Sequence, residues 1–315
     1  MDSLVSTGVD SPAGDLRRRC DTAISEAAPS DLRDTRRTTG GGKLTRSFLR
    51  HFLVYGVALV ISLPFLWVLL SAFKPEQELA GYPPTFIPET WTFSNFTEFF
   101  RATQFHKAMR NSAILAVATT VISILLAAPA AYALSRFRGR TFSWIARLFI
   151  FSYMVPPILL VLPVFRIFFN LNLANNLAGL VVIYVALVMP LSLWMLRSFF
   201  AGVPRELDEA AIVDGASRLQ AFVYDILPQA LPGIIAASIV AANIGWSEYL
   251  FASTLLTTPD LLTISPRLES FMGRGLYNWG WLMAGSLAVT APLLVVAVAL
   301  QKRFAAGIGA GALKG

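Results

Sequence analysis

The chain has 315 residues, of which 55% are hydrophobic and only 14% are charged. Soluble domains carry about 25% charged residues, so the composition excludes an ordinary soluble protein and indicates a membrane protein. The net charge of +7 does not indicate nucleic acid here, because the basic residues flank apolar runs, as the positive-inside rule predicts. The single cysteine, Cys20, permits no internal disulfide, and the sequence shows no metal-ligand spacing.

Residues 1–46 form a polar, arginine-rich segment with few large apolar side chains. Such a segment cannot bury enough apolar surface to offset the entropy that it would lose on ordering. We therefore expect a disordered, basic cytoplasmic tail, followed by a transmembrane domain at 47–315.

Six apolar segments follow, and each is close to or above the roughly 20 residues with which a helix crosses the hydrocarbon core. The predicted spans are 48–73, 111–134, 144–168, 177–200, 230–250 and 279–300. The loop after the second span contains Arg136, Arg138 and Arg140, which places that loop in the cytoplasm. The predicted fold class is all-α, a polytopic membrane protein with six transmembrane helices, both termini in the cytoplasm and a cytoplasmic end at 301–315.

The third predicted span contains three prolines, Pro156, Pro157 and Pro163. Proline removes a helical hydrogen bond and usually kinks a membrane helix. The segment is therefore either a bent helix or a place where unwound backbone opens onto a solute pathway. The sequence leaves both interpretations open.

A long polar loop, residues 201–229, lies on the cytoplasmic side in this topology. Its first half, Glu206 to Val213, is predicted to be a short helix, because its acidic residues stand in the first turn, where the helix dipole favours them. Gly215 is placed to turn the chain out of that helix.

The second half of the loop begins at Ser217, which is expected to cap another short helix, Arg218 to Asp225, before Leu227 and Pro228 end it. Two short helices with small residues at the bend form a slim knob. The alternative is an amphipathic hairpin lying on the membrane. The acids of the loop argue against that alternative: Glu206, Asp208, Glu209, Asp214 and Asp225.

The loop also carries a recognisable pattern. Its residues Glu209-Ala210-Ala211, Asp214-Gly215-Ala216, Phe222, Ile226, Leu227-Pro228 and Pro232 stand at the spacing of a known motif. This pattern resembles the Glu-Ala-Ala coupling loop of permease subunits of bacterial ABC importers, the binding-protein-dependent transport inner membrane component family. The end of the chain, 301–315, resembles the tail of the maltose-type, MalG-like carbohydrate permeases. The resemblance covers roughly residues 45 to 315 and implies the type I permease fold.

By this resemblance, the loop is the contact to a partner ATPase, with Glu209 paired with an arginine or backbone groups of the ATPase cleft. The implied ATPase-coupling residues are Glu209, Ala210, Ala211, Asp214, Gly215, Ala216, Leu227 and Pro228. The tail residues implied to reach the ATPase, as an extended strand, are Gly311, Ala312, Lys314 and Gly315.

The resemblance also implies the partners: a second permease subunit in a heterodimer, an ABC ATPase dimer, an extracytoplasmic solute-binding protein, the lipid bilayer of the bacterial inner or plasma membrane, and a small carbohydrate. This chain has no nucleotide-binding motif or catalytic set of its own, so we expect it to be no enzyme and to bind no cofactor. ATP and Mg would belong to the partner ATPase subunits.

Polar and aromatic residues on the spans are candidates for the solute pathway. On the fifth span, Asn243, Trp246 and Ser247 share a helical face, and Glu248 follows them. Aromatic rings with polar neighbours suit a sugar, and Tyr153, Tyr184 and Trp194 add to such a surface. Ordinary helix packing and capping, with Glu248 at the outer interface, is the alternative.

The principal alternative function is a secondary transporter driven by ions. That mechanism needs carboxylates at membrane depth, and Glu248 alone offers a thin basis for it. A receptor or structural membrane subunit is a further alternative. Within the importer class, glycerophosphate or an amino acid competes with a carbohydrate as the solute.

Overall fold

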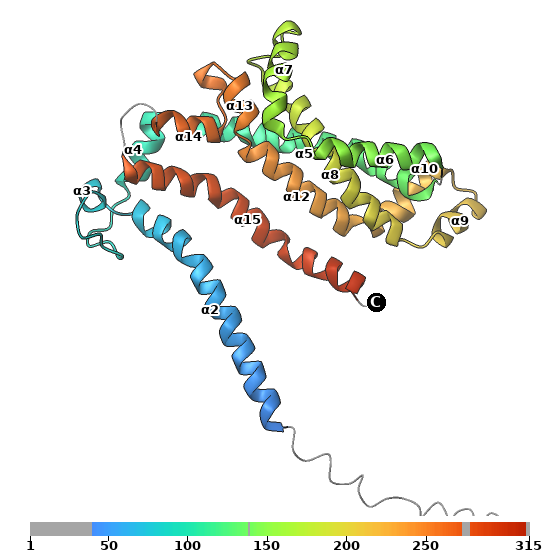
Figure 1. The fold of residues 1–315 in the computed structure, drawn as a ribbon, viewed down its shortest axis with the longest axis horizontal. Coiled ribbons are helices and arrows are strands. Elements are labelled where there is room, and N and C mark those ends of the chain that lie inside the picture. The colour runs from blue at the N-terminus through green and yellow to red at the C-terminus, as the bar shows by residue number, and fades with distance from the viewer. Residues whose placement is uncertain (1–39, 138, 273–277, 313–315) are drawn as a thin grey trace, which may run out of the picture. The chain divides into compact units, whose positions relative to one another are not determined.

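The computed structural model describes residues 40–137, 139–272 and 278–312. The described parts are helical and contain no strand. The chain divides into two compact units, Met1–Pro64 and Phe65–Gly315, and the second contains the packed domain described below. Figure 1 shows the helices, which are α2 Gly40–Ala72, α3 Glu76–Leu79, α4 Ser94–Thr103, α5 Phe105–Arg136, α6 Arg140–Tyr153, α7 Pro157–Asn170, α8 Leu177–Gly202, α9 Glu206–Val213, α10 Arg218–Gln220, α11 Leu227–Gln229, α12 Leu231–Ser247, α13 Leu250–Leu255, α14 Ile264–Met272 and α15 Trp279–Ala312.

Five helical segments among the described residues are long and apolar enough to cross a membrane, and one bent helix pair makes a sixth span if it is counted as one. The five are His51–Ala72, Phe105–Arg136, Leu177–Gly202, Leu231–Leu255 and Trp279–Val296. The predicted order of spans and the all-α polytopic class are therefore confirmed.

The third predicted span is not one continuous helix. Helices α6 and α7 together replace it, and they meet at an angle of 98°. The break falls at Pro156 and Pro157, where Pro157 occupies the first position of α7. Proline is tolerated at that position because its missing N–H has no helical partner there. The backbone thus opens at the predicted prolines, while Pro163 is accommodated inside α7.

Several helix boundaries differ from the predicted ones. Helix α2 begins at Gly40, so residues 40–46 are helical rather than part of the polar tail; residues 1–39 lie outside the described residues. Helix α5 begins at Phe105 rather than at Asn111. Helix α15 continues to Ala312, so that the predicted extended tail is helical up to that residue. Apolar periodicity locates the middle of a helix better than its ends.

The centre of the domain is formed by α5, α8 and α12, which pack against one another. Small residues let these helices approach closely, as is usual in membranes, where there is little hydrophobic driving force between helices. A Cβ on Gly245 of α12 would lie 2.6 Å from the Cα of Ala116 of α5. The buried alanines of α5 and α12 include Ala127, Ala128, Ala131, Ala236, Ala237 and Ala241.

Candidate functional site

The first part of the loop folds as its sequence predicts. Helix α9 spans Glu206–Val213 and has Glu206, Asp208 and Glu209 in its first turn. Gly215 has a φ of 92°, in the left-handed region that favours glycine. At this turn the N–H of Ala216 donates to the carbonyl of Ala211 at 2.9 Å, and that of Gly215 donates to Ile212 at 3.0 Å. These two bonds are the Schellman arrangement that ends a helix.

The second part of the loop begins as predicted and ends differently. The Ser217 hydroxyl accepts from the Gln220 N–H, while the Gln220 side chain accepts from the Ser217 N–H, a capping box. Leu227 and Pro228 do not end this helix. The backbone passes from α10 through a π-helical turn, Ala221–Ile226, into α11. Pro228 is tolerated in the first turn of α11 because it has no N–H to leave unpaired there.

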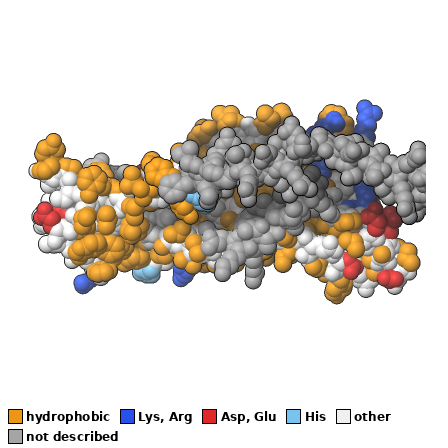
Figure 2. All heavy atoms as spheres, turned by 90° about the horizontal axis from the view of Figure 1, so that it is seen from below, with side chains coloured by type: hydrophobic (Ala, Val, Ile, Leu, Met, Phe, Trp, Pro, Cys, Tyr) orange, Lys and Arg blue, Asp and Glu red, His pale blue; other side chains and the backbone are white. Residues whose placement is uncertain are grey.

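The surface of the loop is open to solvent in the isolated chain. Glu209, Ala210, Asp214, Gly215 and Pro228 are exposed, and Ala211, Ala216 and Leu227 are half-buried. Large apolar side chains stand among the acids: Val213 is 86% exposed, Leu219 71% and Tyr224 73%. Figure 2 shows acidic and basic side chains gathered at the right-hand end of the molecule, which carries α9 and α10 in Figure 1. Exposed apolar groups rimmed by charge are typical of a protein docking surface.

A buried ionic contact fastens α9 to the C-terminal end of α5. The Nε of Arg136 lies 2.7 Å from the Oδ2 of Asp208, and these side chains are only 9% and 14% exposed. The Tyr132 hydroxyl donates to the other Asp208 oxygen, Oδ1, at 2.5 Å. Arg136 also donates from Nη1 to the carbonyl of Val203 at 3.0 Å, just before α9. We call Tyr132, Arg136 and Asp208 the α5–α9 clamp.

Aromatic rings pack against the clamp. The Tyr132 ring lies 4.8 Å from that of Phe222 in the π-helical turn and 5.9 Å from that of Phe200 at the end of α8. Phe200 and Phe222 are themselves buried in the core cluster at this end of the domain. The clamp and Glu209 also line an open cleft of about 560 Å³. The loop is therefore packed against the ends of α5 and α8 through these side chains.

Sequence reasoning missed the clamp. Arg136 stood in a basic cluster that the positive-inside rule already explained, and Asp208 was one of five loop acids. The two residues belong to different elements, and nothing in the local pattern pairs them. An arginine at the end of one helix and an acid in the first turn of another are a weak signal without a contact.

The candidate pathway residues on α12 do not present one shared surface. Trp246 is buried in a core cluster with Phe99 and Phe105, and its Nε1 donates to the carbonyl of Val289 in α15 at 3.0 Å. Asn243 is exposed, and the Ser247 hydroxyl donates back to its carbonyl at 2.9 Å. The Trp246 side chain therefore contributes to the packing of α12 against α15, whereas the Asn243 side chain is exposed on the surface of α12.

The remaining pathway candidates differ in burial and in their contacts. The Glu248 carboxylate accepts from the N–H groups of Phe251 and Ala252 at 3.0 to 3.2 Å and so caps α13, as the capping alternative expected. Tyr184 is fully buried, whereas Tyr153 and Trp194 are each 59% exposed. Their role in solute contact stays a prediction.

Only two of the four C-terminal candidate residues lie among the described residues. Gly311 and Ala312 are the last residues of α15, so the backbone there is helical. Lys314 and Gly315 lie outside the described residues. Contact of this tail with an ATPase stays a prediction.

Comparison with known proteins gives a consistent result. The family "Binding-protein-dependent transport system inner membrane component" matches residues 119–309. The trehalose transport system permease protein SugB of Mycobacterium tuberculosis is 36% identical, over 84% of this chain and 95% of that protein.

Two solved structures share the fold. A bacterial ABC transporter involved in the import of the acidic polysaccharide alginate has a chain that superposes with a TM-score of 0.70 at 22% identity, covering 84% of this chain and 99% of that chain. A bacterial alginate ABC transporter in complex with an alginate pentasaccharide-bound periplasmic protein gives a TM-score of 0.62 at 14% identity, covering 83% of this chain and 96% of that chain.

Proposed function

Because this chain belongs to the binding-protein-dependent transport system inner membrane component family, we propose that it is one of two permease subunits of an ATP-driven importer and forms half of the path for a carbohydrate. The observation that carries the proposal is the exposed loop at α9 and α10, which the α5–α9 clamp fastens to the end of a membrane helix. A rigid attachment of this kind passes the movement of a docked ATPase into the transmembrane domain.

In this mechanism the ATPase dimer binds ATP and Mg, and this chain supplies mechanical coupling. Glu209 is exposed on α9, where its carboxylate can pair with a cation or backbone N–H groups of the ATPase. Gly215 sets the bend, and Ala210, Ala211 and Ala216 keep the knob narrow. Closure of the ATPase dimer then moves α9, and the clamp moves α5 with it. The path opens alternately to the two sides of the membrane, with both termini in the cytoplasm.

The solute is proposed to be a carbohydrate, delivered by an extracytoplasmic binding protein. The support comes from relatives: a similar permease serves trehalose, and a neighbour of the same fold is complexed with a sugar-loaded periplasmic protein. A second, different permease subunit would complete the path. The ion-driven alternative would use the Glu248 carboxylate for ion coupling. That carboxylate already accepts hydrogen bonds from two backbone N–H groups as a helix cap, which argues against this role.

The proposal is tested in proteoliposomes that contain the whole complex. Solute-stimulated ATP hydrolysis and uptake are compared for the wild type, Glu209→Lys and Gly215→Asp, with Asp225→Asn as a matched control on an exposed acid of the same loop. We expect both loop variants to assemble in the membrane and to lose stimulated hydrolysis together with uptake, while the control keeps both. Uptake that follows an ion gradient without ATP hydrolysis would overturn the proposal. Replacing the carbohydrate by glycerophosphate or an amino acid tests the solute class separately.

A further inference from the structure

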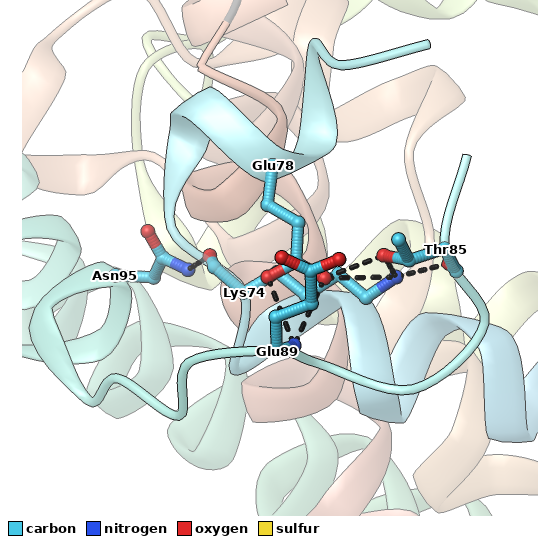
Figure 3. Close-up of polar contacts among 5 residues, drawn as sticks. All are labelled: Lys74, Glu78, Thr85, Glu89 and Asn95. Carbon is cyan, nitrogen blue, oxygen red and sulfur yellow. Dashed lines mark hydrogen bonds and ion pairs between the residues drawn. The ribbon is translucent and has the colours of Figure 1, made fainter. Parts of the chain in front are cut away.

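The segment between α2 and α4 is held in place by a compact polar network, drawn in Figure 3. The Lys74 side chain, only 2% exposed, donates from Nζ to the carbonyl and, at 3.1 Å, to the hydroxyl of Thr85. The Glu78 carboxylate accepts from the Thr85 hydroxyl at 2.5 Å and from the Glu89 N–H at 3.3 Å. A buried ammonium with these partners fixes the loop from Lys74 to Glu89 in one conformation. We call this network the outer lock.

The outer lock is also joined to the ends of two long helices. The Asn95 amide donates to the carbonyls of Ala72 and Lys74 at 2.9 and 2.7 Å, where α2 ends. A Cβ on Gly280 would lie 2.3 Å from the Asn95 side chain, so α15 begins directly against it. The Glu76 carboxylate accepts from the N–H of Gly280 at 3.2 Å, at the start of α15. The loop is thus fixed at the same end of the domain as the end of α2 and the start of α15.

This fixed loop presents an apolar surface that the chain itself does not cover. Figure 2 shows hydrophobic side chains gathered at the left-hand end, which carries α3 and α4 in Figure 1. The large exposed side chains are Tyr82 at 96%, Phe86 at 74%, Ile87 at 68%, Trp91 at 62% and Phe93 at 69%. We call these five residues the outer aromatic surface. Holding so much apolar area exposed on an ordered loop requires something apolar beside it.

The contacts of these side chains locate the surface relative to the membrane helix. Phe86 packs edge-on against Trp67 of α2, with ring centroids 5.3 Å apart. Trp67 lies about 7.5 Å inside the end of α2 along its axis. Trp91 and Phe93 surround Phe73, at 6.0 and 5.2 Å. The loop therefore folds back beside the last turns of α2 instead of projecting away from them.

The neighbouring surface of α2 is itself apolar and uncovered. Phe65, Leu66 and Leu69 are 66%, 43% and 41% exposed, and they belong to a segment that meets the criteria for a membrane span. The outer aromatic surface continues this lipid-facing stripe beyond the helix end. Tyr82 and Trp91 each add a polar tip to an apolar ring, the side-chain type enriched where hydrocarbon meets water.

We propose that the outer aromatic surface is a membrane anchor, which inserts into the interfacial layer of the bilayer on the side opposite the α9 loop. The outer lock holds the anchor in register with α2. The partner is thus the lipid surface itself, and the anchor fixes the depth of the outer end of α2 and of the start of α15. This inference does not depend on which solute the protein carries or on how ATP hydrolysis is coupled.

The experiment measures depth by spin-label accessibility, in the full chain with Cys20→Ser, purified with its accompanying subunits into lipid nanodiscs. A label at Ile87→Cys reports on the anchor, and a label at Glu89→Cys, an exposed polar position in the same loop, is the control. We expect the first label to be accessible to oxygen and protected from a water-soluble nickel chelate, and the second to show the reverse.

Breaking the outer lock gives an independent readout. Thr85→Val removes the hydroxyl that Glu78 and Lys74 share, and Lys74→Met removes the ammonium. With either variant the Ile87→Cys label is expected to become more mobile and severalfold more accessible to the nickel chelate. Two results overturn the proposal. A label freely accessible to the chelate in the wild type shows a surface in water. A label inaccessible to both reagents shows a surface covered by a protein subunit.

Discussion

Removal of the Asp208 charge is expected to uncouple the loop from the membrane helices. Asp208→Asn keeps an oxygen that accepts from the Tyr132 hydroxyl but leaves the Arg136 guanidinium without its counter-charge. The two side chains are 9% and 14% exposed with 2.7 Å between the charged atoms, so the pair is largely desolvated. Breaking one side of a buried pair costs about 3 to 5 kcal/mol, and the lower figure suits a contact at the edge of the domain.

A cost of about 3 kcal/mol changes the equilibrium between the fastened and unfastened loop roughly a hundredfold. The expected phenotype is ATP hydrolysis that persists while solute uptake per ATP falls. Arg136→Met gives the same result, because it leaves Asp208 unpaired. The double variant, Arg136→Met with Asp208→Leu, removes both charges and is expected to recover much of the stability, since apolar replacement of a whole buried pair is often neutral.

The assay is a double-mutant cycle of Arg136→Met, Asp208→Leu and the two together, followed by uptake per ATP hydrolysed and by thermal unfolding, with Asp225→Asn as the exposed control. Coupling of at least about 1.5 kcal/mol between the two positions is the expected result. If the two single effects simply add in the double variant, the clamp transmits nothing and the reasoning fails. If unfolding changes while uptake per ATP does not, the pair is structural only.

Three further predictions concern single positions. Gly215→Ala is expected to strain the turn by about 1 to 2 kcal/mol, because the φ of Gly215 is 92°, and so to weaken co-purification of the ATPase with this chain. The control is Gly202→Ala, where an added Cβ meets nothing within 4 Å. Equal effects of the two variants on co-purification would contradict the turn argument. The pKa of Glu78 lies below its ordinary value of 4.5, chiefly because the Thr85 hydroxyl donates to it, so its stabilisation of the outer lock is present above that value and is lost as pH falls through the lowered pKa. In the wild type, the mobility of a label at Ile87→Cys is expected to rise only at that low pH. In Thr85→Val, where the label is already more mobile, the further rise is expected at a higher pH, and an identical midpoint in both would refute the assignment. Trp246→Phe removes the hydrogen bond to the Val289 carbonyl and is expected to lower the free energy of unfolding by about 1 kcal/mol without altering solute preference. A changed solute preference, compared with that of the exposed-site variant Trp194→Phe, would show that Trp246 contacts the solute.

The sequence alone determined the features that depend on neighbouring residues. The spans follow from runs of apolar side chains, because a helix must satisfy its own backbone groups in lipid. Helix α9, the left-handed Gly215 and the Ser217 cap follow from contacts within about five residues. These were predicted at Glu206–Val213, Gly215 and Ser217, and the structure confirms all three.

Tertiary structure decided the features that join distant residues. Tyr132 and Asp208 are separated by 76 positions, and their contact exists only because α5 and the loop meet at one end of the domain. Trp246 was predicted from its helical spacing to lie on the solute pathway, and only the folded chain shows that its ring packs in a core cluster and bonds to α15. The three prolines of the third span predicted a kink. Its angle of 98° depends on how α6 packs on α8 and on how α7 packs on α13. Long-range packing and buried charge pairs have no fixed sequence spacing, so only the folded chain reveals them.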